Sequence, residues 1–156
     1  MNVRRTRDIA INHQTSAHAY LFGSIPAWTR GVSDIRDELL GGECYVIDGE
    51  IEALESYVSI TPMAREMSGV WLLDTLVPVN ASRAHWDALL VSVVAAHVGA
   101  FLSARIVQRF SVDQVARSEA TEAAGWKREG VLTGYYRSRG VPVDAEQWAL
   151  YRGSAS

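Results

Sequence analysis

The chain has 156 residues and a mass of 17.2 kDa, so we expect a single domain over residues 1–156. Hydrophobic residues make up 48% and charged residues 21%, a balance typical of a globular protein and one that excludes wholesale disorder. The net charge of −3 gives no electrostatic argument for a nucleic-acid partner. Cys44 is the only cysteine, which excludes an internal disulfide and a cysteine-rich zinc module.

No segment has the pattern of an export signal or a membrane span. The basic residues 1–7 are followed by residues 8–16, which lack the apolar stretch of a signal peptide. The longest apolar run, residues 88–102, is interrupted by polar residues and glycine and is too short to cross a bilayer. We therefore expect a cytoplasmic protein with no membrane partner.

The first forty residues contain two candidate helices, residues 15–23 and residues 32–40, with Pro26 between them. Ser33 is a plausible N-cap for the second helix, and Gly41 a stop signal. A β-hairpin is predicted next, because residues 44–47 are apolar and residues 50–60 alternate apolar with polar. The Asp-Gly pair between these two segments supplies the positive φ angles of a tight turn.

A βαβ unit is predicted in the middle of the chain. Residues 70–77 are nearly continuously apolar, as expected of a strand buried on both faces, and Pro78 ends the strand. Residues 82–102 carry apolar side chains at helical spacing, with Ser82 as the expected N-cap, and residues 105–112 form the next strand. A right-handed crossover would make the two strands parallel neighbours.

The remaining segments complete a mixed α/β fold. We predict a short helix over residues 118–124 that ends at Gly125, then strands over residues 126–136 and 147–152. The order of elements predicts a mixed, mostly antiparallel sheet of six or seven strands flanked by helices.

Residues 125–152 resemble the C-terminal part of the GNAT superfamily of N-acetyltransferases, in particular its ribosomal-protein-alanine and small-molecule branch. The shared pattern is carried by Gly125, Trp126, Lys127, Glu129, Gly130, Gly140 and Asp144. The resemblance implies a GNAT-like sheet whose fourth and fifth strands separate, and between these strands the pantetheine arm of acetyl-CoA would pair with exposed backbone of the fourth strand.

The same resemblance implies an acetyl-CoA pyrophosphate loop at residues 81–86, where backbone N–H groups at the start of a helix would meet the phosphates. Ser82, Ala84 and Trp86 stand where the family has glycines, so we expect the indole of Trp86 to narrow the phosphate path. The implied cofactor-binding residues are Leu76, Val77, Ser82, Arg83, Ala84, His85, Trp86 and Gln114.

Three residues are candidates for catalysis. The resemblance places Thr121 where the family often has a tyrosine that acts as general acid, and threonine lacks useful acidity. Asp74 interrupts an apolar strand and is either a general base, with its pKa raised by burial, or a carboxylate paired with an arginine such as Arg109. Glu55, on the second hairpin strand, either contacts an amine substrate or is a solvated surface residue.

The other reactive side chains have structural interpretations. We expect His85 to be a surface histidine at the start of a helix, and His97 to be a core histidine. Cys44 is expected to be a buried strand thiol. The spacing of the four histidines supports no metal site.

Two functions follow as hypotheses. The first is an acyltransferase that moves an acetyl or related acyl group from CoA, or from a carrier thioester, to an amine of a small-molecule substrate. The alternative is a repurposed GNAT scaffold that binds an organic small molecule without acetyl-CoA and catalyses another reaction, such as a cyclisation or a decarboxylation, or only binds. A homodimer is left open.

Overall fold

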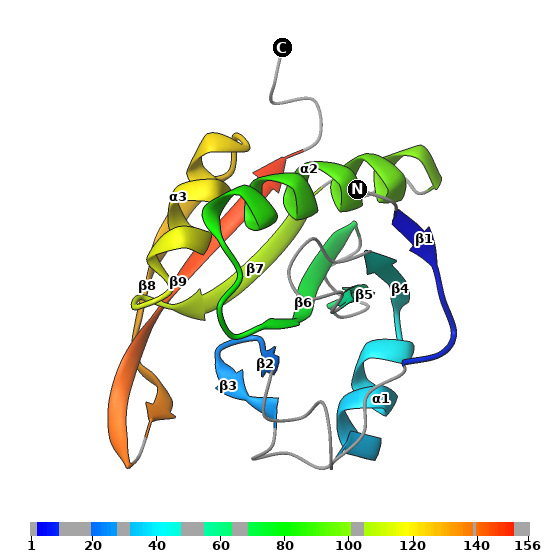
Figure 1. Ribbon diagram of the computed structural model, residues 1–156. Helices are drawn as coiled ribbons and strands as arrows, with labels where there is room; N and C mark the ends of the chain where they lie inside the picture. Colours follow the sequence, from blue (N-terminus) through cyan, green and yellow to red (C-terminus); the bar gives the residue numbers. More distant parts are fainter. Residues whose placement is uncertain are drawn as a thin grey trace.

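A mixed β-sheet forms the centre of the computed structural model (Figure 1), which describes residues 3–9, 20–27, 32–47, 55–63, 69–100, 105–138 and 140–151. The elements in these ranges are β1 Val3–Arg5, β2 Tyr20–Phe22, β3 Ile25–Pro26, α1 Val32–Leu40, β4 Glu43–Ile47, β5 Ser56–Pro62, β6 Val70–Pro78, α2 Arg83–Ala100, β7 Arg105–Ser111, α3 Val115–Ala123, β8 Lys127–Ser138 and β9 Val141–Tyr151.

The main path of the sheet has the strand order β1-β4-β5-β6-β7-β9-β8, and β2 and β3 lie off this path. Neighbouring strands are antiparallel except for β6 and β7, which are parallel. The predicted mixed, mostly antiparallel sheet is therefore confirmed, with β2 and β3 as two short strands beyond the six or seven expected.

The helices cover both faces of the sheet, with α2 and α3 on one face and α1 on the other (Figure 1). Alternate side chains of β6 point to opposite faces: Leu73 and Val77 pack in the cluster that includes α2, and Leu76 packs in the cluster that includes α1. Because both faces of the sheet are covered at β6, its residues are almost all apolar. This is the pattern from which the strand was predicted. None of the described helices is long and apolar enough to span a bilayer.

The parallel strands β6 and β7 separate after a short region of pairing. Val70, Trp71 and Leu72 of β6 pair with the first three residues of β7, and the pairing stops there although both strands continue. The predicted separation of these two strands is confirmed. We call the region between β6 after Leu72 and β7 after Val107 the splay.

Strand β2 occupies the edge of β6 in the splay. Leu76 of β6 pairs with Tyr57 of β5 on one side and with Phe22 of β2 on the other. Because β5 takes one edge of β6, β2 must take the edge that faces β7. The predicted helix over residues 15–23 is therefore wrong at Tyr20–Phe22, where pairing with β6 outweighs local helical spacing; residues 15–19 lie outside the described residues.

Several boundaries differ from the sequence-based predictions. The predicted antiparallel hairpin pair is formed by β4 and β5, with Ile47 opposite Ser56 rather than residue 50; the predicted Asp-Gly turn, residues 48–49, lies outside the described residues. Helix α3 begins at Val115 rather than at residue 118, and β9 begins at Val141 rather than at residue 147. The predicted helix stop at Gly125 is confirmed by its φ of 92°.

Candidate functional site

A cavity of about 420 Å³ lies where β6 and β7 end, and its lining comes from β2, the loop after β6, the first turn of α2 and the start of α3. Ala81 and Trp86 line it from the α2 side, and Gln114 and Arg117 line it from the α3 side. Both helices therefore begin beside this cavity, as the resemblance implies for a thioester-binding groove.

The start of α2 is capped as its sequence predicts. The side-chain oxygen of Ser82 accepts a hydrogen bond from the backbone N–H of His85 at 3.1 Å, which confirms Ser82 as the N-cap. Ala84 is exposed to solvent, and Arg83 forms ion pairs with Asp87 at 3.0 Å and Glu119 at 2.9 Å. The hydrogen bond from Arg83 to Asp87 is the main reason that the pKa of Arg83 is raised. Arg83 thus links α2 to α3 on the surface.

His85 is buried, so the expectation of a surface histidine is wrong. Its Nε2 lies 2.8 Å from the side-chain oxygen of Ser56 on β5, because the third residue of α2 faces the sheet rather than solvent. His97 is the predicted core histidine: it is buried and its ring packs edge-on against Trp71, with the ring centroids 5.2 Å apart. Burial lowers the pKa of His97.

Arg117 of α3 is the most unusual side chain near the cavity. Its residue is only 1% exposed, and the guanidinium lies between the rings of Trp86 and Phe110, 4.8 Å and 4.5 Å from their centroids. It donates hydrogen bonds to the Oε1 atom of Gln108 at 3.1 and 2.9 Å and to the hydroxyl of Thr75 at 3.2 Å. Burial lowers the pKa of Arg117 to about 10, an effect that the charges of Tyr136 and Asp74 oppose.

The contacts of Arg117 join the two separated strands, because Thr75 belongs to β6 and Gln108 to β7. All three hydrogen bonds go to neutral acceptors. The two aromatic rings supply a favourable cation–π environment for the buried charge. No sequence pattern indicates this role, since a single arginine in a short amphipathic helix normally faces solvent.

Trp86 is a core residue as well as a wall of the cavity. It is 6% exposed and packs in the cluster that α2 forms with the sheet. Trp86 therefore lies at the start of α2, as predicted, and it also has a structural role in the core that the sequence did not reveal. Whether its indole narrows a phosphate path stays a prediction.

Gln114, Leu76 and Val77 are brought to the splay, where they contact β2 and the turn that follows it. The amide nitrogen of Gln114 donates to the carbonyl of Gly23 at 3.0 Å and to the hydroxyl of Ser24 at 2.8 Å. Its Oε1 atom is buried without a hydrogen-bond partner among the described residues. Leu76 and Val77 pair with Phe22 and Leu21 of β2.

Asp74 lies near the splay, as predicted. It is half-buried on β6, and its charge acts on both Arg117 and Tyr136. Burial raises the pKa of Tyr136, and the charge of Arg117 opposes that rise. The pairing with Arg109 that the sequence allowed is not formed; Arg109 donates instead to the Oε1 atom of Gln147 at 2.8 Å.

Tyr136 is a candidate that sequence reasoning missed. Its hydroxyl donates to the carbonyl of Arg109 at 3.2 Å, and it also forms a hydrogen bond with Ser24. It comes from β8, far along the chain from Asp74, so only the pairing of the C-terminal strands with β7 brings it here. The available signal is the adjacent pair Tyr135-Tyr136, but aromatic residues in a strand more often indicate packing than function.

Like Asp74, the other two catalytic candidates are not among the residues that line the cavity. The hydroxyl of Thr121 is buried and donates to the carbonyl of Arg117 at 2.7 Å, so it is used within α3. Glu55, just before β5, accepts a hydrogen bond from the hydroxyl of Tyr57 at 2.9 Å and lies 3.8 Å from Arg4. Neither residue lines the cavity.

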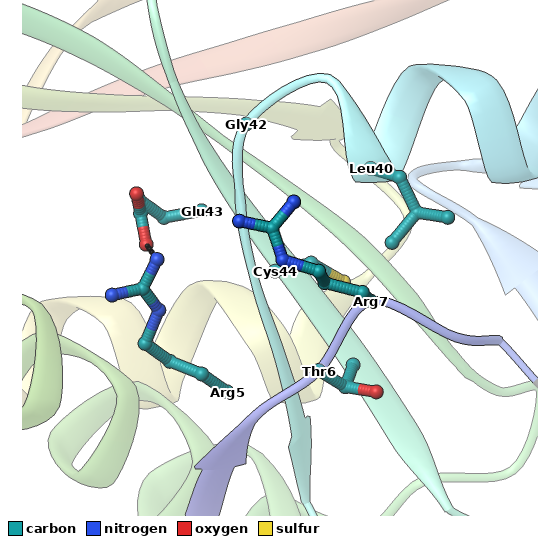
Figure 2. Close-up of a pocket in the computed structure, with 7 residues that line it drawn as sticks. All are labelled: Arg5, Thr6, Arg7, Leu40, Gly42, Glu43 and Cys44. Carbon is teal, nitrogen blue, oxygen red and sulfur yellow. Dashed lines mark ion pairs between the residues drawn. The ribbon is translucent and has the colours of Figure 1, made fainter.

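A second cavity, of about 610 Å³, lies near the β1 edge of the sheet, lined by the end of β1 and the residues after it, the end of α1 and the start of β4 (Figure 2). Arg5 and Glu43 form an ion pair there at 2.5 Å. Cys44 lines this cavity but is buried, which confirms the expected strand thiol, and burial raises its pKa to about 11. In the described part of the chain, no group of three or more histidine, cysteine or acidic side chains is arranged to hold a metal ion.

Comparison of the fold finds N-acetyltransferases. A ribosomal-protein-alanine N-acetyltransferase from Brucella melitensis superposes with a TM-score of 0.54 at 15% identity, covering 74% of this chain and 72% of that one. Mutant forms of the spermidine/spermine N-acetyltransferase SpeG from Vibrio cholerae give 0.59 at 10%, covering 78% and 75%. Arabidopsis thaliana NAA60 in complex with acetyl-CoA gives 0.58 at 15%, covering 79% and 85%. No family model and no curated protein sequence matches the chain.

Proposed function

The chain has the fold of the GNAT-family N-acetyltransferases, and we propose that it is an acyltransferase that transfers an acetyl or related acyl group from a thioester to an amine. The observation that carries this proposal is the parallel pair β6 and β7, which separates beside a cavity where two helices begin. A helix N-terminus supplies free N–H groups and a favourable field for an anion such as the phosphates of CoA. By their names, the structural neighbours include acetyltransferases of spermidine and spermine and of ribosomal-protein alanine.

Asp74 is the group that we propose as general base. A primary amine is protonated at neutral pH and must lose a proton before its lone pair can attack a thioester carbonyl. Asp74 would accept that proton directly or through a water molecule. As the new carbon–nitrogen bond forms, the thioester carbon–sulfur bond breaks and the thiolate leaves, taking a proton from solvent. The charge of Asp74 acts on Arg117 and Tyr136, and the positive charge of Arg117 would favour the ionised form of the carboxylate, which can accept a proton.

The residues of the splay do not fit an extended thioester arm in the arrangement seen here. The backbone of β6 that such an arm would pair with already pairs with β2, and Gln114 is hydrogen-bonded to Gly23 and Ser24. This observation favours a second candidate function, the repurposed scaffold that binds a small organic molecule without acyl-CoA. We give it second place because the separated strands, the cavity and the two helix starts are all retained.

The experiment that tests the proposed function is an assay of thiol release. Purified protein is mixed with acetyl-CoA and, in separate reactions, with spermidine, a peptide with an N-terminal alanine, and a small amino acid. Free CoA is measured with a thiol reagent and the acylated amine by mass spectrometry. The proposal expects amine-dependent CoA release with at least one amine. Absence of release with every amine, together with absence of acetyl-CoA binding, would contradict it and support the repurposed scaffold.

A further inference from the structure

The short segment β2–β3 occupies the one edge of β6 that a ligand could otherwise pair with. Three residues of β2 pair antiparallel with β6: Tyr20 with Pro78, Leu21 with Val77 and Phe22 with Leu76. The pairing is extended by the backbone N–H of Gly23, which donates to the carbonyl of Thr75 at 2.8 Å. An unpaired strand edge can form backbone hydrogen bonds with any extended peptide or ligand. In this protein, β2 already takes up that edge of β6.

Residues around the splay form hydrogen bonds with polar groups of the turn that follows β2. The hydroxyl of Ser24 accepts a hydrogen bond from the backbone N–H of Ser111, at the end of β7, at 2.6 Å. Gln114 donates to the same hydroxyl and to the carbonyl of Gly23. Tyr136 also forms a hydrogen bond with Ser24. The turn therefore contacts β7, the start of α3 and β8 at once, and it closes the splay between β6 and these elements.

We propose that the β2–β3 segment, residues 20–26, is an internal occupant of the donor site, which an acyl thioester must displace from β6 before it can bind in the splay. This inference rests on the proposed function. Gln114, which the family resemblance assigned to the thioester arm, is bonded to the segment instead. The buried Oε1 atom of Gln114 has no partner among the described residues, so the side chain has an acceptor left for another group once the segment has moved.

The backbone pairing that holds the occupant on β6 is short, although Tyr20 and Phe22 are also buried in the core cluster that includes α1. Its paired strand is only three residues long, and its partner β3 has two. The turn depends on Gly23, whose φ of 63° is a left-handed conformation that residues with a Cβ adopt only with strain. A short two-stranded ribbon is marginally stable by itself, so its stability comes from β6 and from the core cluster in which Tyr20 and Phe22 are buried.

The test compares two glycine substitutions. Gly23→Val places a β-branched residue at positive φ. Nothing lies within 4 Å of the new Cβ, so the substitution strains the backbone of the turn without a steric clash with neighbouring residues. Gly140→Val is the matched control: Gly140 has a φ of 79°, also has open space at its Cβ, and lies in the distant turn between β8 and β9. Binding of acetyl-CoA to wild type and both variants is measured by calorimetry.

We expect Gly23→Val to bind acetyl-CoA on the order of tenfold more tightly than wild type, since strain in the turn favours its release. Gly140→Val should bind as wild type does. Ser24→Ala, which removes the acceptor used by Ser111 and Gln114 without any backbone strain, should also tighten binding and serves if Gly23→Val does not fold.

Two results would overturn the inference, and they differ in what they say of the proposed function. If wild type and Gly23→Val bind acetyl-CoA with equal affinity, or Gly23→Val binds more weakly, the segment is no competitor, while acyl transfer stands. If neither wild type nor any variant binds acetyl-CoA, release of the segment does not open a donor site, and the proposed function fails with the inference.

Discussion

Arg117 of α3 donates a hydrogen bond to the hydroxyl of Thr75 on β6, at 3.2 Å, across the region where the backbone pairing between β6 and β7 has ended. The same guanidinium is bonded twice to Gln108 on β7. A planar group with donors in a fixed fork is needed for this bridge, because the two acceptors lie on different strands. On the face of the sheet that α2 and α3 cover, the side chain thus links the two strands where their backbone hydrogen bonds have ended.

Replacing Arg117 with lysine should destabilise the protein more than replacing it with methionine. Lysine keeps a charge but is a compact, strongly hydrated ion that cannot bridge both acceptors, so its burial between two rings is unfavourable. Methionine fills the space between Trp86 and Phe110 without a buried charge. We expect Arg117→Lys to lower the free energy of unfolding by about 2–3 kcal/mol in urea titrations.

The control for this comparison is Arg128→Lys, at an exposed position of β8, which should change stability by less than about 0.5 kcal/mol. Equal stability of Arg117→Lys and wild type would show that the bridge between the strands needs only a positive charge.

Asp74→Asn should lower kcat/KM for acyl transfer by about 100-fold or more, because the amide keeps the shape of the carboxylate but accepts no proton. The melting temperature is measured alongside, to show that the fold is intact. Asp37→Asn, at an exposed position of α1, is the matched control and should retain wild-type activity. Unchanged activity of Asp74→Asn would assign the base to another group.

Gly42→Ala should destabilise the protein by about 1–3 kcal/mol, the usual result of overpacking. A Cβ at residue 42 would lie 2.8 Å from the backbone carbonyl of Ile60 and 2.2 Å from the hydroxyl of Thr61. Gly130→Ala is the control, since nothing lies within 4 Å of a Cβ there. Thermal unfolding of the two variants is compared with wild type, and equal melting temperatures for Gly42→Ala and Gly130→Ala would show that β5 moves aside without loss.

Stability should fall as the pH decreases below about 6.5, the ordinary pKa of histidine, partly because of His97. Burial lowers the pKa of His97 in the folded protein, so over this range the unfolded chain binds a proton that the folded chain does not. His97→Gln should therefore lose less unfolding free energy than wild type between pH 7.5 and pH 5, as measured by urea titration at each pH. Parallel losses for the two proteins would mean that His97 does not titrate differently on folding.

Segments with a strong pattern of their own were predictable from the sequence. The strand β6 and the helix α2 were predicted correctly because the spacing of their own apolar residues shows which of their faces are buried. Tyr20–Phe22 was misassigned because a three-residue strand is too short to show a period, and what makes it a strand is its pairing with β6, more than fifty residues away in the sequence.

The candidate site was predictable only where a motif sets the positions. Ser82 was identified as the cap of α2 from local chemistry, and Asp74 was placed near the splay because an acidic residue stands out in an apolar strand. Arg117 and Tyr136 were missed, since their roles depend on packing between α3, β7 and β8. The burial of His85 was missed for the same reason: its partner Ser56 lies on another strand.

The most direct test of the account is hydrogen exchange at the amide of Gly23 in the wild-type protein, with and without saturating acetyl-CoA. In the structure this amide is hydrogen-bonded to Thr75 on β6. If the donor displaces the β2–β3 segment, exchange at Gly23 becomes faster when acetyl-CoA is added, although ligand binding normally slows exchange in a site. Exchange that stays unchanged or becomes slower would show that residues 20–26 remain on β6 while the donor is present, and would contradict the account.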